Sequence, residues 1–181
     1  MSEPRIIWTV GHSTHDAAAF VQLLTSAGIQ RVADVRRFPA SRRQPHFCKD
    51  ELRASLAAAD IGYLHLPDLG GRRGEPAADS PNTGWRVASF AAYADYMNAP
   101  AFEAALSQLA DAAAAAPTAM MCAEALPWRC HRRLIADAMI VRGWEVRDIL
   151  SNATIEPHAL TPFAKVEHGR LTYPPEQASL F

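Results

Sequence analysis

The segment from Cys122 to Arg133 collects residue types that often do chemistry: two thiols, a carboxylate, a histidine and several guanidinium groups. Cys122 follows an apolar run, whereas Cys130 and His131 stand just before a predicted helix. A thiol near a helix N-terminus and beside cations is stabilised as the thiolate, which is the nucleophilic form. We therefore predict a reactive cysteine in this segment, with Cys130 favoured as the nucleophile and Cys122 as its competitor.

Acid–base groups accompany the two thiols. Glu124 is expected to act as an acid or base, or to orient His131. The plainer alternative is that each thiol is a small buried apolar residue. Zinc is disfavoured, because the C-x7-C-H spacing lacks the closely paired ligands of structural zinc sites. We predict neither a metal nor a cofactor.

Arginines are clustered in a chain whose formal net charge is only −1. That charge gives no general reason to expect binding to nucleic acid or membrane. Nine of the eighteen basic residues nevertheless lie in three polar stretches, at 36–43, 72–73 and 129–133. If the fold brings these stretches together, they form a local anion site. The arginines predicted to contact the anion are Arg36, Arg37, Arg42, Arg73 and Arg132.

Two shorter motifs follow predicted strands. Gly11-His12-Ser13 suits an anion, because glycine lets the backbone approach closely and N–H groups at a helix start add positive charge. Ser13 and Asp16 also fit a helix-opening capping box. Asp34, just ahead of Arg36, is interpreted either as a substrate contact or as half of a strand-end ion pair. All these residues are therefore candidates for the anion site.

Apolar periodicity predicts strands near 6–10, 31–35, 63–66, 118–121 and 144–149, with helices between them. This alternation is typical of an α/β fold with an open, mainly parallel sheet of about five strands and helices on both faces. Ligands bind such sheets at the carboxyl ends of the strands, so the polar clusters are expected to meet at one edge. One domain is predicted at 1–151, followed by a C-terminal appendage and flexible tail at 152–181.

Composition limits the broad class of protein. The 181 residues are 49% apolar, which suits one domain with a sizeable core. An odd number of cysteines and the lack of a recognisable leader favour reduced thiols in the cytoplasm. No apolar run is long enough for a membrane span, so no membrane partner is expected. The oligomeric state stays open.

Taken together, four motifs resemble the bacterial family called domain of unknown function 488. They are Thr9-Val10-Gly11-His12-Ser13, Asp34-Val35-Arg36-x-x-Pro39-x-Ser41, Leu69-Gly70-Gly71-x-Arg73, and Cys122-Ala123-Glu124 through Cys130-His131-Arg132. The resemblance covers roughly residues 6–150. It implies an α/β fold and a shared polar site, but no reaction.

Two smaller likenesses suggest different reactions. Cys130-His131-Arg132 resembles the cysteine-histidine-arginine core of DNA alkyl-transferring repair proteins, although Arg129 replaces their preceding proline. The order of strand, Cys122, loop and basic helix start is similar to the active-site half of rhodaneses, although the loop here is longer and lacks their glycine. The first likeness favours nucleic-acid chemistry, and the second favours sulfur transfer.

The last five residues, Gln177-Ala178-Ser179-Leu180-Phe181, resemble the peptide by which bacterial repair and replication proteins dock on the DNA sliding clamp. Gln177, Leu180 and Phe181 would contact the clamp; alternatively, Leu180 and Phe181 fold back onto the domain. We therefore expect a DNA-associated, repair-type enzyme or accessory protein that binds a nucleotide or phosphate through its Arg/His/Cys site. The alternatives are a rhodanese-like sulfurtransferase and a non-catalytic anion-binding module.

Overall fold

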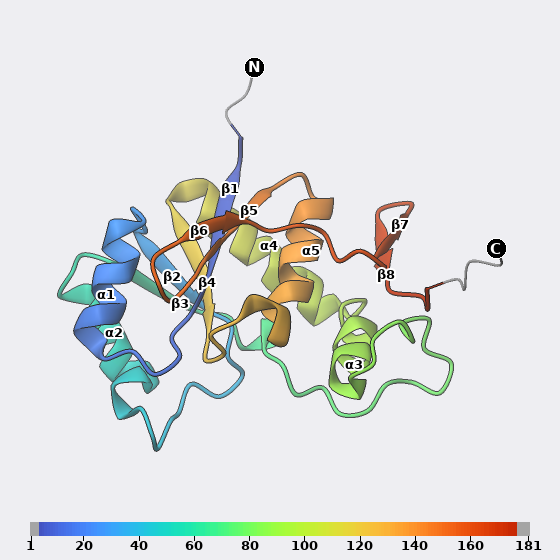
Figure 1. Ribbon diagram of the computed structural model, residues 1–181, viewed down its shortest axis with the longest axis horizontal. Coiled ribbons are helices and arrows are strands. Elements are labelled where there is room, and N and C mark those ends of the chain that lie inside the picture. Colours follow the sequence, from blue (N-terminus) through green and yellow to red (C-terminus); the bar gives the residue numbers. More distant parts are fainter. Residues whose placement is uncertain (1–3, 177–181) are drawn as a thin grey trace.

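A computed structural model of the chain describes residues 4–176. Its central feature is a six-stranded sheet in the order β3-β2-β4-β1-β5-β6 (Figure 1). The strands are β1 (Ile6–Gly11), β2 (Arg31–Asp34), β3 (Gly62–His65), β4 (Thr118–Cys122), β5 (Glu145–Ile149) and β6 (Ile155–Pro157). The first five are parallel, and β6 pairs antiparallel with β5. The predicted open α/β fold is confirmed.

Helices cover both faces of this sheet (Figure 1). On one side lie α1 (Ala17–Ser26) and α2 (Lys49–Ala57), and on the other lie α3 (Ala88–Tyr96), α4 (Pro100–Ala115) and α5 (Arg132–Val141). Short 3-10 turns at Pro45–Phe47, Pro67–Leu69 and Pro127–Arg129 each begin with proline, whose fixed φ suits the first position of a helical turn. The chain therefore changes faces between β3 and β4.

Each parallel strand contributes to two separate cores, because successive side chains point to opposite faces. Val32 belongs to the core that contains Phe20 on the α1/α2 side, whereas its neighbour Ala33 belongs to the core that contains Leu109 on the α4/α5 side. β4 is buried along its whole length. Because β4 lies in the middle of the sheet between β2 and β1, its last residue, Cys122, is held in a fixed position.

The start of α1 differs from the prediction. Asp16, not Ser13, caps the helix, and its carboxylate accepts a 2.7 Å hydrogen bond from the Ala19 N–H. Ser13 has φ = 47° and lies in the turn before the helix. The predicted capping box at Ser13 is therefore wrong, because the tight turn after β1 delays the helix by several residues.

The segment after residue 151 is joined to the domain more closely than an appendage would be. It supplies β6, which raises the strand count from the expected five to six, and a hairpin of β7 (Lys165–Glu167) and β8 (Arg170–Thr172). Tyr173 is fully buried and donates a 2.8 Å hydrogen bond to Asp137 of α5. The weak periodicity of this segment gave no signal that the single aromatic residue Tyr173 attaches it to the domain.

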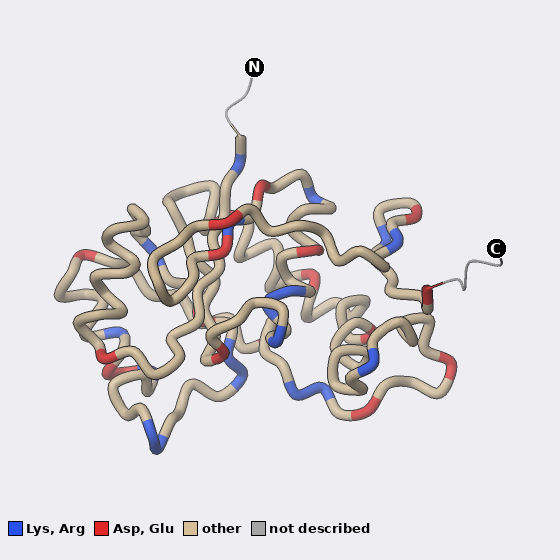
Figure 2. The backbone as a smooth tube through the Cα atoms, viewed as in Figure 1, with Lys and Arg blue, Asp and Glu red and all other residues tan. Residues whose placement is uncertain are grey.

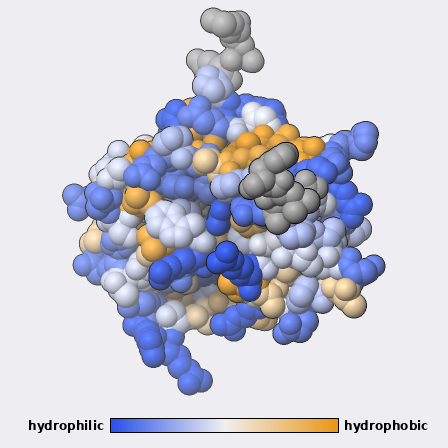
Figure 3. Space-filling view, turned by 45° about the vertical axis from the view of Figure 1, so that its right-hand side comes forward, coloured by the Kyte–Doolittle hydropathy of each residue, from blue (hydrophilic) through white to orange (hydrophobic). Residues whose placement is uncertain are grey.

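Charged and apolar side chains are unevenly placed on the surface. Figure 2 shows basic segments along the lower side of the molecule, where the parallel strands end. Polar side chains predominate on the face seen in Figure 3. In the part of the chain that the structure describes, the exposed large apolar side chains are Phe38, Val87, Trp128, Ile155 and Val166. Across residues 4–176, no helix combines the length and apolarity needed to cross a bilayer.

Candidate active site

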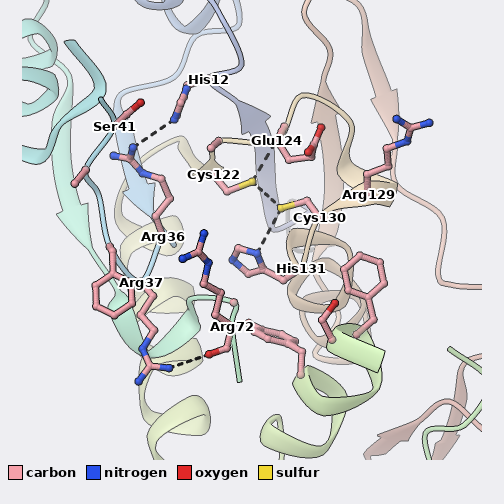
Figure 4. Close-up of a pocket in the computed structure, with 17 residues that line it drawn as sticks. His12, Arg36, Arg37, Ser41, Arg72, Cys122, Glu124, Arg129, Cys130 and His131 are labelled. Carbon is pink, nitrogen blue, oxygen red and sulfur yellow. Dashed lines mark hydrogen bonds between the residues drawn. The ribbon is translucent and has the colours of Figure 1, made fainter. Parts of the chain in front are cut away.

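A cavity of about 580 Å³ lies at the carboxyl ends of β1, β2 and β4 (Figure 4). This is the edge where an open parallel sheet binds ligands. Its lining includes His12, Arg36, Arg37, Phe38, Ser41, Arg72, Cys122, Glu124, Arg129, Cys130 and His131. The structure therefore brings residues from four separate parts of the sequence to one site.

Cys122, Cys130 and His131 line one side of the cavity; with the buried Arg132 behind them they form a thiol cluster. The Sγ atoms of Cys122 and Cys130 are 2.6 Å apart, and both cysteines are free thiols. Cys130 Sγ also lies 3.5 Å from His131 Nδ1 and accepts a 3.5 Å hydrogen bond from the Arg132 backbone N–H. Cys122 ends β4 and Cys130 lies just before α5, so the strand and the helix fix the two sulfur atoms together.

The two thiols have opposite acidities. Burial alone would raise the pKa of Cys130, but a hydrogen bond from the Cys122 thiol, together with His131 and the Arg132 charge, lowers it well below its ordinary value. Burial raises the pKa of Cys122, and the bond to Cys130 adds to this effect. These contacts therefore favour the thiolate on Cys130 and the proton on Cys122.

A backbone carbonyl orients His131. The ring Nε2 lies 3.0 Å from the Val35 oxygen, which places a proton on Nε2 and leaves Nδ1 facing Cys130. The expectation that Glu124 orients His131 is therefore wrong. Glu124 is exposed, and within residues 4–176 its carboxylate has no hydrogen-bond or ion-pair partner. It remains at the cavity edge as a candidate acid or base.

Arg132 is a buried cation behind the thiols, with 1% of its surface exposed. Its guanidinium donates to the Thr9 hydroxyl and to the Glu124 carbonyl, and no ion pair with Asp or Glu is found for it in the described part of the chain. Burial would lower the pKa of Arg132, but the nearby thiols raise it. Arg132 therefore favours the thiolate form of the neighbouring cysteines.

His12 and Arg36 line another part of the cavity, and Asp34 and Tyr63 lie behind them; these four residues form a carboxylate cluster. Arg36 Nε and Nη2 donate to the two Asp34 oxygens at 2.8 and 2.7 Å, and the Tyr63 hydroxyl donates to the same carboxylate at 2.7 Å. Arg36 Nη1 lies 3.3 Å from His12 Nε2. The ion-pair interpretation of Asp34 agrees with these contacts.

His12 is held neutral within the carboxylate cluster. Its ring stacks on Phe47 with centroids 4.1 Å apart, and its Nδ1 lies 3.0 Å from the Ser13 oxygen. Burial lowers the pKa of His12 to about 4, despite the opposing hydrogen bond to Ser13. A neutral His12 with both ring nitrogens occupied supports Arg36 but adds no positive charge to the cavity.

The turn after β1 does not offer free N–H groups to an anion. The His12 and Ser13 amides donate to the carbonyls of Cys122 and Ala123 at 2.9 and 3.0 Å. A Cβ on Gly11 would lie 2.0 Å from the Glu124 carbonyl oxygen. Gly11 is therefore needed to admit the 124–125 backbone, which is a packing role rather than the expected cradle for an anion.

The arginines of the glycine-rich loop have separate roles. Arg73, predicted to contact the anion, instead donates to the carbonyls of Gly70, Pro67 and Asp68 and stacks on Tyr96. Its neighbour Arg72 lines the cavity with φ = 62°, and Figure 4 shows its guanidinium directed between Arg36 and His131. The left-handed turn separates the paths of two consecutive side chains.

Arg37 and Arg42 differ in their relation to the cavity. Arg37 lines it and donates to the Arg72 carbonyl at 3.0 Å. Arg42 is exposed and is not among the lining residues. Arg72 and Arg129 line the cavity, as expected for the basic stretches at 72–73 and 129–133, although neither was among the arginines singled out as anion contacts. Phe38 and Ser41 line it as well, and no site role was predicted for these two side chains.

Two further site predictions concern metal binding and clamp docking. Within residues 4–176, no group of three or more His, Cys, Asp and Glu side chains is arranged to hold a metal ion. The predicted clamp-docking residues Gln177, Leu180 and Phe181 lie outside the described residues.

Comparison with known proteins gives one match. A family model described as "Domain of unknown function DUF488" matches residues 16–139, a range that includes both thiols of the cavity and His131. Neither a curated protein nor a solved structure matches the chain.

Proposed function

This chain is a member of the DUF488 family, and we propose that it is a cysteine-dependent enzyme acting on a phosphate-bearing substrate of the nucleotide class. The observation that carries the proposal is the pair of buried thiols 2.6 Å apart, with His131 Nδ1 at 3.5 Å from Cys130 Sγ and the buried Arg132, which has no carboxylate ion pair within residues 4–176, next to them in the chain fold. Burying a cation without a counter-charge costs free energy, and a thiolate next to Arg132 offsets that cost. A stabilised thiolate beside a cavity is the arrangement of a nucleophile.

Cys130 is the attacking group, and His131 handles its proton. The Val35 carbonyl fixes the His131 ring so that Nδ1 faces Cys130 Sγ at 3.5 Å. Nδ1 can take the thiol proton as the thiolate forms, and can return a proton to a leaving group. Cys122 donates its S–H to the thiolate, which favours ionisation of Cys130 over Cys122.

The cavity lining favours a nucleotide as the substrate. Its volume of about 580 Å³ lies within the usual range for small-molecule sites. Arg37, Arg72 and Arg129 line it, and no carboxylate within residues 4–176 forms an ion pair with them. Guanidinium groups suit phosphate geometry, and the ring of Phe38, 67% exposed, offers a stacking surface for a base.

Alkylation of the full chain tests this proposal, with iodoacetamide as the probe and Cys48 as the internal reference. Cys48 lies outside the cavity lining. Cys130 should react at least about tenfold faster than Cys48 at neutral pH, and adenosine monophosphate should slow Cys130 alone. Equal alkylation rates for the two cysteines would reject Cys130 as a nucleophile and favour the alternative of a non-catalytic anion-binding module. Fast alkylation of Cys130 that adenosine monophosphate does not slow would reject a nucleotide as the substrate.

The association with DNA is a separate part of the proposal, supported by the terminal sequence Gln177 to Phe181. A sliding clamp would bring the enzyme to DNA without requiring a basic surface, which is consistent with the formal charge of −1. Binding to a purified bacterial clamp is measured for the full chain, for a chain lacking 177–181, and for Leu180→Ala. Unchanged clamp affinity in both variants would reject the sliding clamp as a partner of this tail.

Sulfur transfer is the second candidate, favoured by the placement of Cys122 at the end of β4 before a basic helix start. In this alternative the arginines hold a sulfur oxyanion instead of a nucleotide phosphate. Incubation with thiosulfate should then leave a persulfide on Cys122 or Cys130, detected by mass spectrometry. An unmodified protein after prolonged incubation would reject this candidate.

A further inference from the structure

The two sulfur atoms of the thiol cluster lie very close together, although catalysis by a single cysteine does not require a second thiol at this distance. They are 2.6 Å apart, whereas a disulfide bond joins sulfur atoms at about 2.05 Å. A movement of about half an ångström would therefore bring them to bonding distance. Both side chains are almost fully buried, with 3% and 5% exposure, so neither is free to swing away into solvent.

Neighbouring elements hold this geometry from three sides. Cys122 is the last residue of β4, and Cys130 accepts the Arg132 N–H at the start of α5. Between them, the Glu124 carbonyl accepts from Arg132 and packs against Gly11, where even a Cβ has no room. The intervening loop is therefore anchored, and the close approach of the thiols is built into the domain.

Arg132 contacts the surroundings of both sulfur atoms: its backbone N–H donates to Cys130 Sγ, and its guanidinium and the Cys122 thiol both contact the Glu124 carbonyl. Its charge can therefore balance a negative charge on either sulfur. While Cys130 is the thiolate, Cys122 keeps its proton and donates it to Cys130. Once Cys130 carries a covalent group, its negative charge disappears and its lone pair no longer holds the Cys122 proton. The thiolate favoured by Arg132 is then that of Cys122.

We propose that Cys122 is a resolving thiol, and that the pair exchanges two electrons with anionic low-molecular-weight disulfides that enter the arginine-lined cavity. The inference rests on the proposed function, because it uses Cys130 as the attacking group. It adds a thiol–disulfide exchange activity and gives each cysteine a distinct step.

The Cys130 thiolate attacks one sulfur of a disulfide RSSR, a Cys130–SR bond forms, and RS⁻ leaves. Cys122 then attacks Cys130 Sγ, the Cys122–Cys130 bond forms, the Cys130–SR bond breaks, and the Cys122 proton leaves with the second product as RSH. The cysteine pair is oxidised by two electrons, and RSSR is reduced to RS⁻ and RSH. An external dithiol reverses the sequence.

Oxidised glutathione is the test probe, because it is a disulfide that carries carboxylates. The full chain, Cys122→Ser, Cys122→Ala, Cys130→Ser and the control Cys48→Ser are incubated with it, acid-quenched and mapped by mass spectrometry. The wild-type chain and Cys48→Ser should form the Cys122–Cys130 disulfide. Both Cys122 variants should instead accumulate glutathione on Cys130, by about tenfold or more over wild type. In Cys130→Ser, Cys122 should stay unmodified, because burial raises the pKa of its thiol; rapid glutathionylation of Cys122 in this variant would contradict the assignment of Cys130 as the attacking thiol.

The outcomes separate this inference from the proposed function. If Cys130 alkylates rapidly with nucleotide protection but the Cys122 variants accumulate no mixed disulfide, the resolving role fails and the proposed function stands. If glutathione stays on Cys130 in the wild-type chain without closure to Cys122, the resolving role also fails. If Cys130 is no more reactive than Cys48 in alkylation, the proposed nucleophile fails whatever the redox result. Alanine and serine at position 122 together guard against an effect of a buried hydroxyl.

Discussion

The thiol cluster and the carboxylate cluster both contribute side chains to one cavity, yet their charges are balanced differently. In the carboxylate cluster, Arg36 is bound at two points by Asp34, and each polar group has a named partner. In the thiol cluster, Arg132 has no carboxylate ion pair within the described residues, and its Nε has no partner. The paired Asp34 and Arg36 fix the position of the Arg36 side chain, whereas a buried cation without a carboxylate partner stabilises a reactive anion.

The largest expected effect is on stability and comes from breaking the carboxylate cluster. Asp34→Ala leaves Arg36 buried without its counter-charge, which should lower the free energy of unfolding by about 3–5 kcal/mol. Urea denaturation measures the change. Glu145→Ala, which breaks an exposed pair with Arg147, is the control and should cost at most about 1 kcal/mol. A small loss for Asp34→Ala would contradict the structural role of this cluster.

The pH dependence of stability should come next in size. Unfolded His12 takes up a proton near pH 6.5 and folded His12 near pH 4, so the unfolded state gains the proton first as pH falls. The free energy of unfolding should therefore drop by roughly 2–4 kcal/mol from this residue across that window, and no further below it.

Comparison with His12→Gln isolates the contribution of His12. The variant is less stable at neutral pH because it loses stacking on Phe47, but its stability should fall less steeply between pH 6.5 and pH 4. Urea midpoints measured across that range give both slopes. Parallel curves for the two proteins would mean that burial does not hold His12 neutral.

The thiol cluster is tested through Arg132→Met, which removes the balancing cation but keeps most of the apolar stem. The pKa of Cys130 should rise, and alkylation of Cys130 at neutral pH should slow by about 10- to 100-fold. The control is Arg133→Met, since Arg133 donates to Thr161 and not to the thiols. The measurement is the alkylation rate as a function of pH; an unshifted profile would show that Arg132 is not the counter-ion.

The smallest effect concerns two adjacent arginines. Arg72→Ala should weaken protection of Cys130 by adenosine monophosphate roughly fivefold, or about 1 kcal/mol, because an exposed phosphate contact is lost. Arg73→Ala should leave this protection constant unchanged and should lower thermal stability, because Arg73 donates to three loop carbonyls. Equal losses of protection would mean that the loop acts as one basic surface.

Local patterns predicted the elements and the location of the site well. The apolar β-branched run at 6–10 and the fully buried run at 118–121 are strands, and the polar residues after them meet at the cavity. This worked because parallel strands place their carboxyl ends at one edge. Asp16, not Ser13, caps α1, and Tyr173 returns to the core, because a turn conformation and one buried side chain leave no periodic signal.

The sequence by itself therefore determined the order of strands and helices and the set of polar residues at one edge of the sheet. Only the tertiary structure decided their roles. It paired Arg36 with Asp34, turned Arg73 away while Arg72 entered the cavity, and placed the Val35 carbonyl behind His131. It also set Arg132 beside Cys122 and Cys130. Charge balance depends on which groups share a buried space, and residues far apart in the chain share that space only after folding.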